Sequence, residues 1–321
     1  MTDFRTRIDG GLAALLTDAS DAAAAELLAE DAVWDMMAPV DTVSGRAGIE
    51  TRVLAPLRAA FIEPRRRPEM VIGGANRRDA GGIWVAGFGH IVGTHVAPLW
   101  GVAPSGRLAF LRYGEFHRLD PAGERIVASK IILDLPDLIR QAGRQPFPEH
   151  LGTEMLFPGP ATHDGVCPMA GDGAASLDLV ERMLGDLHLY DPETGASKGQ
   201  IGADGTWSDD MLWYGPSGIG SNYRWAGFVR DHRGPFLRAF PDRKGGNHYC
   251  RIGDGNYAAV SGWPSMTMTH AADYLGLPVT GKALTLRVMD FYRCADGRIA
   301  ENWVLLDYVD LARQMGHDIL H

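Results

Sequence analysis

Cysteine is scarce in this chain of 321 residues, which holds only Cys167, Cys250 and Cys294. Three cysteines that lie far apart cannot make a framework of paired disulfides, and they are typical of a reducing compartment. Neither a C-x-x-C nor an H-E-x-x-H spacing occurs, so no metal site is predicted. A G-x-S-x-G elbow and a phosphate-binding P-loop are missing as well, which disfavours a serine hydrolase or an NTPase.

Long apolar runs and an excess of positive charge are also lacking. The longest apolar run is far shorter than the ~20 residues of a membrane span, and the chain begins without the apolar core of a signal sequence. The net charge is −9, and the one dense basic run, at 65–67 between two prolines, is expected to form a solvated turn. The composition therefore predicts a cytoplasmic protein with no nucleic-acid or membrane partner.

What the chain does contain is a copy of itself. Residues 110–143 align with residues 285–316 when a two-residue gap is placed at the turn. Upstream, the Thr-His pair that ends at His95 matches the pair that ends at His270. Solenoid repeats are only ~20–50 residues long, so a repeat of this length indicates a domain. The total length agrees with two domains of ~150 residues each.

The repeat divides the chain into a first domain at 1–143, a linker at 144–173 and a second domain at 174–321. The linker is rich in proline and glycine and is expected to lie over the surface. Each copy shows a helix, a strand, a helix and then a run of strands that closes on a hairpin. This order predicts an α+β fold in which helices cover a curved antiparallel sheet and leave a pocket inside the cone.

Four motifs of the second copy carry a family resemblance. They are Thr-His at 269–270, Leu-Gly-Leu-Pro-Val-Thr-Gly at 275–281, Asp-Phe-Tyr-Arg at 290–293 and Asp-Gly-Arg-Ile-Ala-Glu-Asn-Trp at 296–303. In this pattern the second copy resembles the SnoaL-like polyketide cyclases, which have the nuclear-transport-factor-2-like cone fold. The first copy departs from the pattern in its loop at 99–106 and in its strand, which has Glu-Phe-His-Arg at 115–118. It also carries Lys130 where the second copy has Trp303.

The resemblance implies chemistry without a metal or an organic cofactor. In such cyclases a carboxylate inside the cone acts as general acid and base on an activated C–H or a carbonyl and closes a ring by an aldol reaction, while a nearby histidine orients it. The carboxyl needs a pKa raised by an apolar pocket. We therefore expect a cyclase-like enzyme that acts on a small hydrophobic or aromatic carbonyl compound. Single-domain relatives commonly pair as dimers, so the fused copies can imitate that pair, and a further homodimer is allowed.

Alternation along one strand selects the catalytic candidates. Asp290 and Tyr292 in the second copy share a face, as do Glu115 and His117 in the first. That face lines the cone or forms a polar surface with an arginine salt bridge, and the resemblance favours the interior. Asp290 with His270 is the expected acid/base pair of the second copy. Glu115 with His117 is its counterpart in the first copy, unless that copy is degenerate.

Further side chains are candidates for binding the substrate. They are Tyr292, Asn302, Trp303, Trp213, Trp34, His95 and Lys130. Trp34 and Trp213 match each other and could form the floor of a pocket, although aromatic residues in strands more often pack in the core. His95 ends a strand, where a histidine bonded to the backbone is as reasonable as a ligand contact. Lys130 either changes the charge of the first pocket or reaches solvent.

Two other functional classes stay open. One is a different enzyme on the same cone, such as a dehydratase, an isomerase or an epoxide hydrolase. The other is a non-catalytic protein that binds a hydrophobic metabolite. The polarity of the pocket separates these classes, because a buried carboxyl within reach of a histidine favours catalysis, whereas a wholly apolar cone favours binding.

Overall fold

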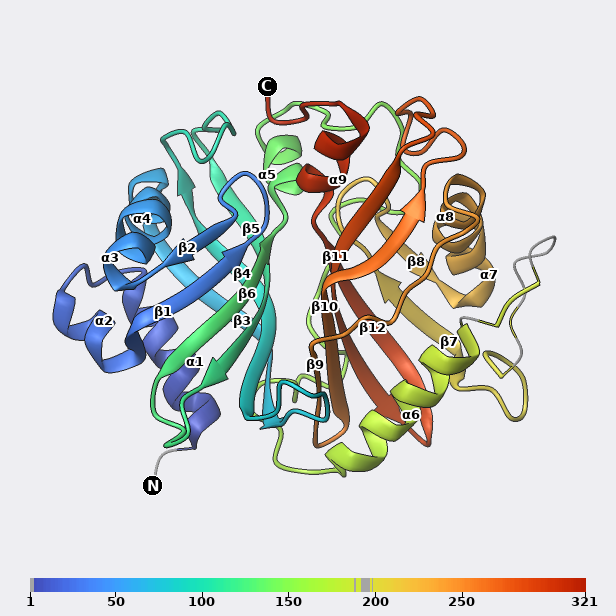
Figure 1. Cartoon of the computed structure of the whole chain (residues 1–321), viewed down its shortest axis with the longest axis horizontal. Coiled ribbons are helices and arrows are strands. Elements are labelled where there is room, and N and C mark those ends of the chain that lie inside the picture. Colours follow the sequence, from blue (N-terminus) through green and yellow to red (C-terminus); the bar gives the residue numbers. More distant parts are fainter. Residues whose placement is uncertain (1–2, 188, 192–196, 198) are drawn as a thin grey trace.

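Two mixed β-sheets stand side by side in the centre of the molecule, with most of the helices on their outer sides (Figure 1). The computed structural model describes residues 3–187, 189–191, 197 and 199–321. Each sheet has six strands, and the strand orders are β2-β1-β6-β5-β4-β3 and β8-β7-β12-β11-β10-β9. The two halves thus repeat one topology, and the α+β fold with two tandem cones that the sequence predicted is confirmed.

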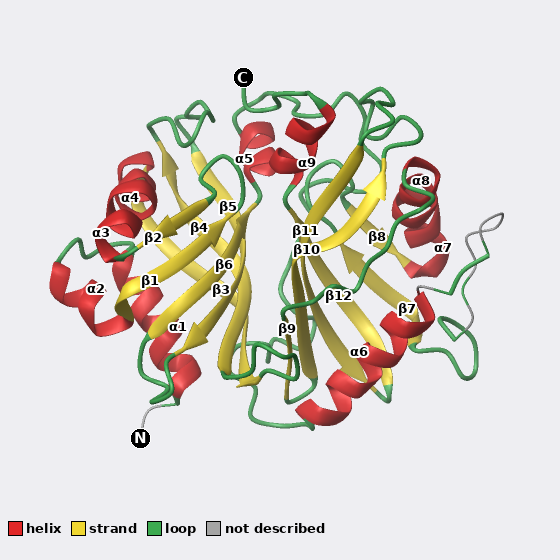
Figure 2. Ribbon diagram, viewed as in Figure 1, coloured by secondary structure: helices red, strands yellow, loops and turns green. Residues whose placement is uncertain are grey.

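The first half begins with two helices and ends with a short one. Its helices are α1 (Phe4–Leu15), α2 (Asp21–Leu27), α3 (Arg46–Ile49), the π-helical turn η1 (Glu50–Leu54), α4 (Ala55–Ala60) and α5 (Leu135–Gln141). Its strands are β1 (Leu28–Met36), β2 (Thr42–Ser44), β3 (Phe61–Ala75), β4 (Ile83–His95), β5 (Leu108–Leu119) and β6 (Ile126–Leu133). Helices α1 to α4 cover the outer face of this sheet (Figure 2).

The second half repeats this order with one helix at its start. Its helices are α6 (Gly173–Leu187), α7 (Arg224–Phe228), the π-helical turn η2 (Val229–Arg233), α8 (Gly234–Ala239) and α9 (Tyr308–Met315). Its strands are β7 (Trp207–Tyr214), β8 (Ser221–Tyr223), β9 (Cys250–Asp254), β10 (Tyr257–Thr269), β11 (Ala283–Ala295) and β12 (Arg298–Leu306). Among the described residues, no helix has the length and apolar character that crossing a membrane requires.

One strand pair in each sheet departs from the expected antiparallel arrangement. Strand β1 runs parallel to β6, and β7 runs parallel to β12. Two parallel strands need a long connection between them. Here the connection contains all the elements of the half that lie between its first and last strands, namely the covering helices and the antiparallel strands. The first strand of each half therefore lies between the last strand and the short edge strand, β2 or β8.

Aromatic side chains fill the space between the two sheets. Phe116 and Phe291 occupy the same position of the repeat and contact each other, with ring centroids 5.5 Å apart. Phe88 of the first half stacks on Trp303 of the second at 5.0 Å. A contact between two equivalent residues is the mark of a twofold arrangement. The halves therefore pack like the two subunits of a symmetric dimer.

Two buried aspartates make reciprocal contacts across this interface. Asp134 of the first half accepts a hydrogen bond of 3.1 Å from the backbone N–H of Ser217, and Asp307 of the second half accepts one of 3.1 Å from the backbone N–H of Ala38. Each aspartate also caps its own helix, α5 or α9. Because burial raises the pKa of both carboxyls to about 6, these contacts join the halves through groups that titrate in mildly acidic solution.

The segment between the halves is mostly exposed, but two of its side chains are more deeply buried than a surface linker suggests. None of residues 144–172, all of which the structure describes, belongs to a helix or a strand. Two of its phenylalanines are nevertheless buried. Phe147 packs edge-on against Tyr308 at 5.6 Å, and Phe157 packs against Phe88 at 5.7 Å. The prolines keep this segment out of regular structure, while the apolar side chains fasten it to the interface between the sheets.

The basic run at 65–67 is a second difference from expectation, because it lies inside β3 and forms no turn. The register of β3 against β4 shifts on both sides of the run, before Arg65 and after Pro68. Such bulges accommodate prolines, which cannot donate a ladder hydrogen bond. The side chain of Arg66 points inward, and only 6% of it is exposed.

Candidate functional site

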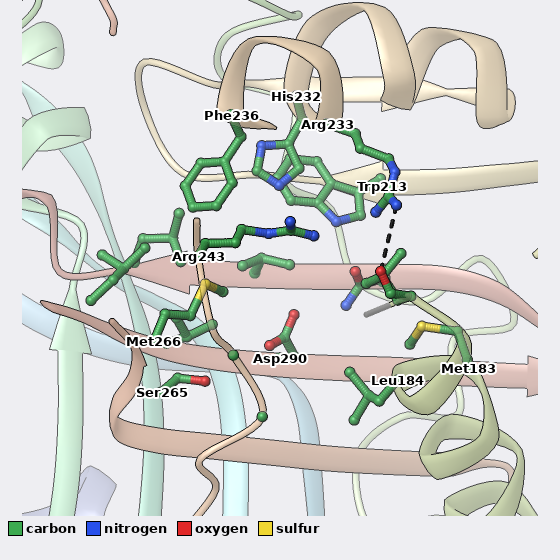
Figure 3. Close-up of a pocket in the computed structure, with 18 of the residues that line it drawn as sticks. Met183, Leu184, Trp213, His232, Arg233, Phe236, Arg243, Ser265, Met266 and Asp290 are labelled. Carbon is green, nitrogen blue, oxygen red and sulfur yellow. Dashed lines mark hydrogen bonds between the residues drawn. The ribbon is translucent and has the colours of Figure 1, made fainter. Parts of the chain in front are cut away.

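A cavity of about 110 Å³ lies in the second half, between its sheet and the helices that cover it (Figure 3). Strands β7, β11 and β12 contribute one wall, and α6, η2 and α8 contribute the other. Most of the lining is apolar and includes Met183, Leu184, Trp213, Phe228, Phe236, Val288 and Leu306. The polar side chains are fewer: His232, Arg233, Arg243, His248, Ser265, Asp290, Tyr292 and Asn302. An apolar cavity with a few convergent polar groups is the usual form of a small-molecule site.

Asp290 reaches this cavity because side chains alternate along β11. Asp290 and Tyr292 line the cavity, whereas Phe291 between them points to the opposite face of the sheet, where it meets Phe116. Asn302, on the neighbouring strand β12, pairs with Tyr292 and lines the same wall. The polar face of β11 is thus the inner face of the cone.

The surroundings of Asp290 favour its protonated form. Burial raises the pKa of its carboxyl to about 7, and polar contacts with Asn302 and Tyr292 offset only part of this effect. Among the described residues, no arginine or lysine pairs with this carboxyl. A carboxyl with this pKa holds and releases a proton at neutral pH, which is the property that general acid/base catalysis requires.

A histidine that the sequence analysis did not single out faces the same cavity. His232 lies on η2 and stacks on Trp213, with ring centroids 4.3 Å apart and planes 16° from parallel. Burial, with Arg243 and Arg233 nearby, lowers the pKa of His232 to about 3, so the ring is neutral. The four-residue spacing of Phe228, His232 and Phe236 places all three on one helix face, and that spacing was the signal available in the sequence.

The first half holds a smaller cavity of about 40 Å³ at the equivalent place. Glu115 and Trp34 line it, but so does Arg66, whose guanidinium pairs with the Glu115 carboxylate. Burial by itself would raise the pKa of Glu115, yet Arg66 and His117 outweigh that effect and lower it to about 2. Glu115 is therefore a fixed anion in an ion pair, unlike Asp290.

Other groups fix this ion pair in place. Arg66 also contacts Asp9 on α1 at 2.7 Å and lies 4.2 Å from the centre of the Tyr113 ring. The Nε2 atom of His117 lies 3.3 Å from Glu115, and its Nδ1 atom is 2.7 Å from the hydroxyl of Ser129. The polar face of β5 is therefore occupied by the protein itself and leaves little room for a ligand.

Strand register shows where Arg66 belongs in the repeat. Arg65 pairs with Val92, which stands three residues before His95 at the end of β4. Arg66 follows directly and projects into the first cone. The second half has no long β3-like strand at this place, because β9 is short and the chain before it is irregular.

An isolated bridge still gives the register in the second half. Lys244 pairs with Thr267, which stands three residues before His270, the matching histidine directly after β10. The residue that corresponds to Arg66 is therefore Gly245. Gly245 and the following Gly246 line the larger cavity. A glycine in place of a buried arginine removes both the volume that fills the first cone and the cation that would ionise Asp290.

The two histidines that end equivalent strands lie outside the cavities. His270 is fully buried, its Nδ1 atom is 3.1 Å from the hydroxyl of Thr280, and its ring packs near Phe240 at 5.6 Å. His95 is also fully buried and stacks on Phe61 at 5.1 Å. Neither lines its cavity, because each sits at the loop end of a strand. The expected pairing of His270 with Asp290 is not formed.

Two further candidates lie between the halves and not in a cone. Trp303 belongs to the interface between the sheets, where its indole N–H donates a 2.7 Å hydrogen bond to the carbonyl of Pro158. Lys130 pairs with Asp35 and lies 5.7 Å from the ring centre of Trp263 in the second half. On the strand β12, Asn302 and Trp303 point to opposite faces, which explains why only the first of them lines the cavity.

Comparison with known proteins finds a family similarity within the second half. Residues 203–315 match the family model described as SnoaL-like polyketide cyclase. Among solved structures, AclR from Streptomyces galilaeus, a proposed hydroxylase, is 21% identical, covers 45% of this chain and 87% of its own, and has a TM-score of 0.35. A proposed polyketide cyclase from Acidithiobacillus ferrooxidans is 20% identical, with coverages of 44% and 94% and a TM-score of 0.35.

A third solved structure is a nuclear-transport-factor-2-like protein from Burkholderia xenovorans. It is 12% identical, covers 45% of this chain and 98% of its own, and has a TM-score of 0.34. No curated protein gave a significant match. The motifs of β10 to β12, the cone that they build and the matched family model agree on one conclusion: residues 203–315 form a SnoaL-like domain.

Proposed function

We propose that this protein is a cofactor-independent enzyme that uses Asp290 as general acid and base on a small, apolar carbonyl compound, in the manner of a polyketide cyclase. One observation carries the proposal. The Asp290 carboxyl faces an apolar cavity without a cationic partner among the described residues, and its pKa is raised to about 7. A structural ion pair would lower that pKa, as it does at Glu115.

The proposed reaction returns Asp290 to its starting state. As a carboxylate, Asp290 takes the proton from a carbon beside a carbonyl group, which leaves an enolate. The enolate carbon attacks a second carbonyl of the same molecule and forms the new C–C bond. The resulting alkoxide takes the proton back from the Asp290 carboxyl. A group with a pKa near the working pH can perform both transfers, because neither protonation state is strongly favoured.

The second half carries the activity in this proposal. Glu115 stays ionised and paired with Arg66, so it cannot supply a proton near neutral pH. The neutral ring of His232 lies in the same cavity as Asp290 and takes the place that we expected for His270. With Trp213 it forms a flat aromatic surface against which a planar substrate can stack.

The test combines binding with turnover. Aromatic and polyketide-like carbonyl compounds are screened by thermal shift on the wild type and on Asp290→Asn, and stabilising compounds are followed for conversion. We expect Asp290→Asn to keep binding and to lose conversion. Asp296→Asn is the matched control, because Asp296 is exposed at the turn that follows the same strand.

Two results would contradict the proposal. If Asp290→Asn converts a compound as fast as the wild type, another group performs the proton transfer. If compounds bind tightly and the wild type converts none of them, the cone is a binding protein. Product analysis separates the remaining enzymes, because an isomerase or a dehydratase also moves a proton through one carboxyl but forms no ring.

A further inference from the structure

The cavity of the second half contains a cation that the proposed acid/base chemistry does not use. Arg243 follows α8, and its side chain extends into the cavity between the ring pair His232–Trp213 and the Asp290 carboxyl (Figure 3). Its guanidinium lies 4.8 Å from the centre of the Tyr190 ring. This geometry places a positive group and an exchangeable proton on facing sides of one small apolar space.

Arg243 has no carboxylate partner among the described residues, where its polar contact is with Tyr190. Burial lowers the pKa of Arg243, and burial together with Arg243 lowers the pKa of Arg233 to about 10. Both effects show that positive charge is unfavourable in this cavity as it stands. Arg243 is partly buried. A partly buried cation without a counter-ion is destabilised, and an anion bound beside it would relieve that penalty.

Other arginines of this fold have their charge matched. Arg251 pairs with Glu181 at 3.0 Å, Arg112 pairs with Asp134 at 3.1 Å, and Arg287 pairs with Asp307 at 2.9 Å. In the first half, Arg66 is matched in the same way by Glu115. Arg243 lines a cavity and has no such partner in the part of the chain that the structure describes, and an anion can reach it there from outside.

We propose that Arg243 forms an anion subsite and that the substrate is a small carbonyl compound whose otherwise apolar skeleton bears one carboxylate, which rests on and narrows the function proposed above for the same cavity. The planar fork of the guanidinium binds the two carboxylate oxygens, and the apolar walls hold the carbon skeleton. The carbonyl end then lies toward Asp290 on the facing wall. A carboxylate is small and planar, so it fits beside the Arg243 guanidinium without bringing further polar atoms into the apolar space.

A matched pair of probes tests this subsite. Binding of 2-acetylbenzoate and of its methyl ester is measured by calorimetry on the wild type, Arg243→Gln, Asp290→Asn and Lys244→Gln. Charge-assisted hydrogen bonds contribute ~1.5–3 kcal/mol, so the wild type is expected to bind the acid about 10- to 100-fold more tightly than the ester. Arg243→Gln is expected to lose this preference. Lys244→Gln removes an exposed cation that does not line the cavity. This variant is expected to keep the preference for the acid.

Each outcome separates the subsite from the acid/base proposal. Asp290→Asn is expected to keep the preference for the acid, because the anion contacts Arg243. Equal affinity for acid and ester in the wild type, no binding of the acid at millimolar concentration, or a preference that persists in Arg243→Gln would overturn the subsite. Those results leave the turnover test of Asp290→Asn unaffected. Conversely, unchanged turnover in Asp290→Asn, with the preference intact, would overturn the acid/base role alone. Melting curves of the four proteins verify that each is folded.

Discussion

The same strand position carries a carboxyl in both halves of this molecule, and the two carboxyls behave in opposite ways. Asp290 faces a cavity of about 110 Å³, and burial raises its pKa to about 7. Glu115 faces a cavity of about 40 Å³, and its pKa falls to about 2 because Arg66 outweighs the effect of burial. The chemical nature of the acid does not decide its proton affinity. The proton affinity of each carboxyl is decided by the residue that the neighbouring chain segment places opposite it.

That neighbouring residue is an arginine in one half and a glycine in the other. Arg66 both neutralises Glu115 and fills the first cone, whereas Gly245 does neither in the second. One position of the repeat thus distinguishes a filled, structural core from an open cavity with a titrating acid. The comparison makes predictions at each of these positions.

The largest expected effect is on turnover in the second half. General acid/base groups typically contribute about 10²- to 10⁴-fold to a rate, so Asp290→Asn should lower kcat by that factor while it leaves ligand binding in place. Glu115→Gln should change kcat by no more than a few-fold, measured on the folded fraction. Equal losses in both variants would mean that the halves are catalytically alike.

The next effect is on the stability of the first half. Removing one partner of a buried ion pair costs about 3–5 kcal/mol. Arg66 keeps its contact with Asp9, so Glu115→Gln should lower the free energy of unfolding by about 3 kcal/mol, at the lower end of that range. The double variant Arg66→Met, Glu115→Leu removes both charges and should recover most of that loss. Urea titrations of the wild type, Glu115→Gln and the double variant measure the free energy of unfolding. A loss well below about 3 kcal/mol in Glu115→Gln would show that Arg66 is well solvated.

A third prediction converts the second half toward the first. Gly245→Arg places a guanidinium where Arg66 stands in the first cone. It should fill the cavity, lower the pKa of Asp290 and abolish both the thermal shift caused by ligands and turnover. The fold should survive, because Gly245 lies in the irregular segment before β9. Retained ligand binding in a folded Gly245→Arg protein would show that the register assigned to this segment is wrong.

The smallest effect is the dependence of stability on pH. A carboxyl whose pKa is raised in the folded state stabilises the fold fully below its unfolded value of about 4, and this contribution is lost as the pH rises through the folded value of about 7. Relative to Asp290→Asn, the wild type should therefore lose about 2–3 kcal/mol of stability between about pH 5 and about pH 8. Asp134 and Asp307 titrate in both proteins, so their effects cancel. If the free energies of unfolding of the wild type and of Asp290→Asn changed with pH in the same way, the raised pKa of Asp290 would be contradicted.

Much of the fold was predictable because it depends on local patterns that occur twice. The repeated hairpin and its flanking helix fixed the two α+β cones, and alternation on one strand placed Asp290 and Tyr292 on a common face. The parallel pairs β1–β6 and β7–β12 were not visible, since they join strands from opposite ends of each half.

The site was less predictable, because partners across strands leave no local signal. Arg66 appeared to belong to a solvated turn, yet it lies on β3 against Glu115, 49 positions away in the chain. His270 carried the family motif but sits at a strand end outside the cone, while His232 and Arg243 reach the cavity from segments without a motif. Periodicity shows which residues share a face, and only the folded chain shows what that face meets.

The most direct test of this account is a titration of the two carboxyls in one protein. Carbon-detected NMR of protein labelled at the carboxyl carbons, with Asp290→Asn and Glu115→Gln to assign the signals, reports both pKa values. The account predicts that Asp290 titrates near pH 7 and that Glu115 remains ionised until the protein unfolds in acid. An Asp290 signal that titrates near its ordinary value of about 4, or a Glu115 signal that titrates above it, would contradict the account.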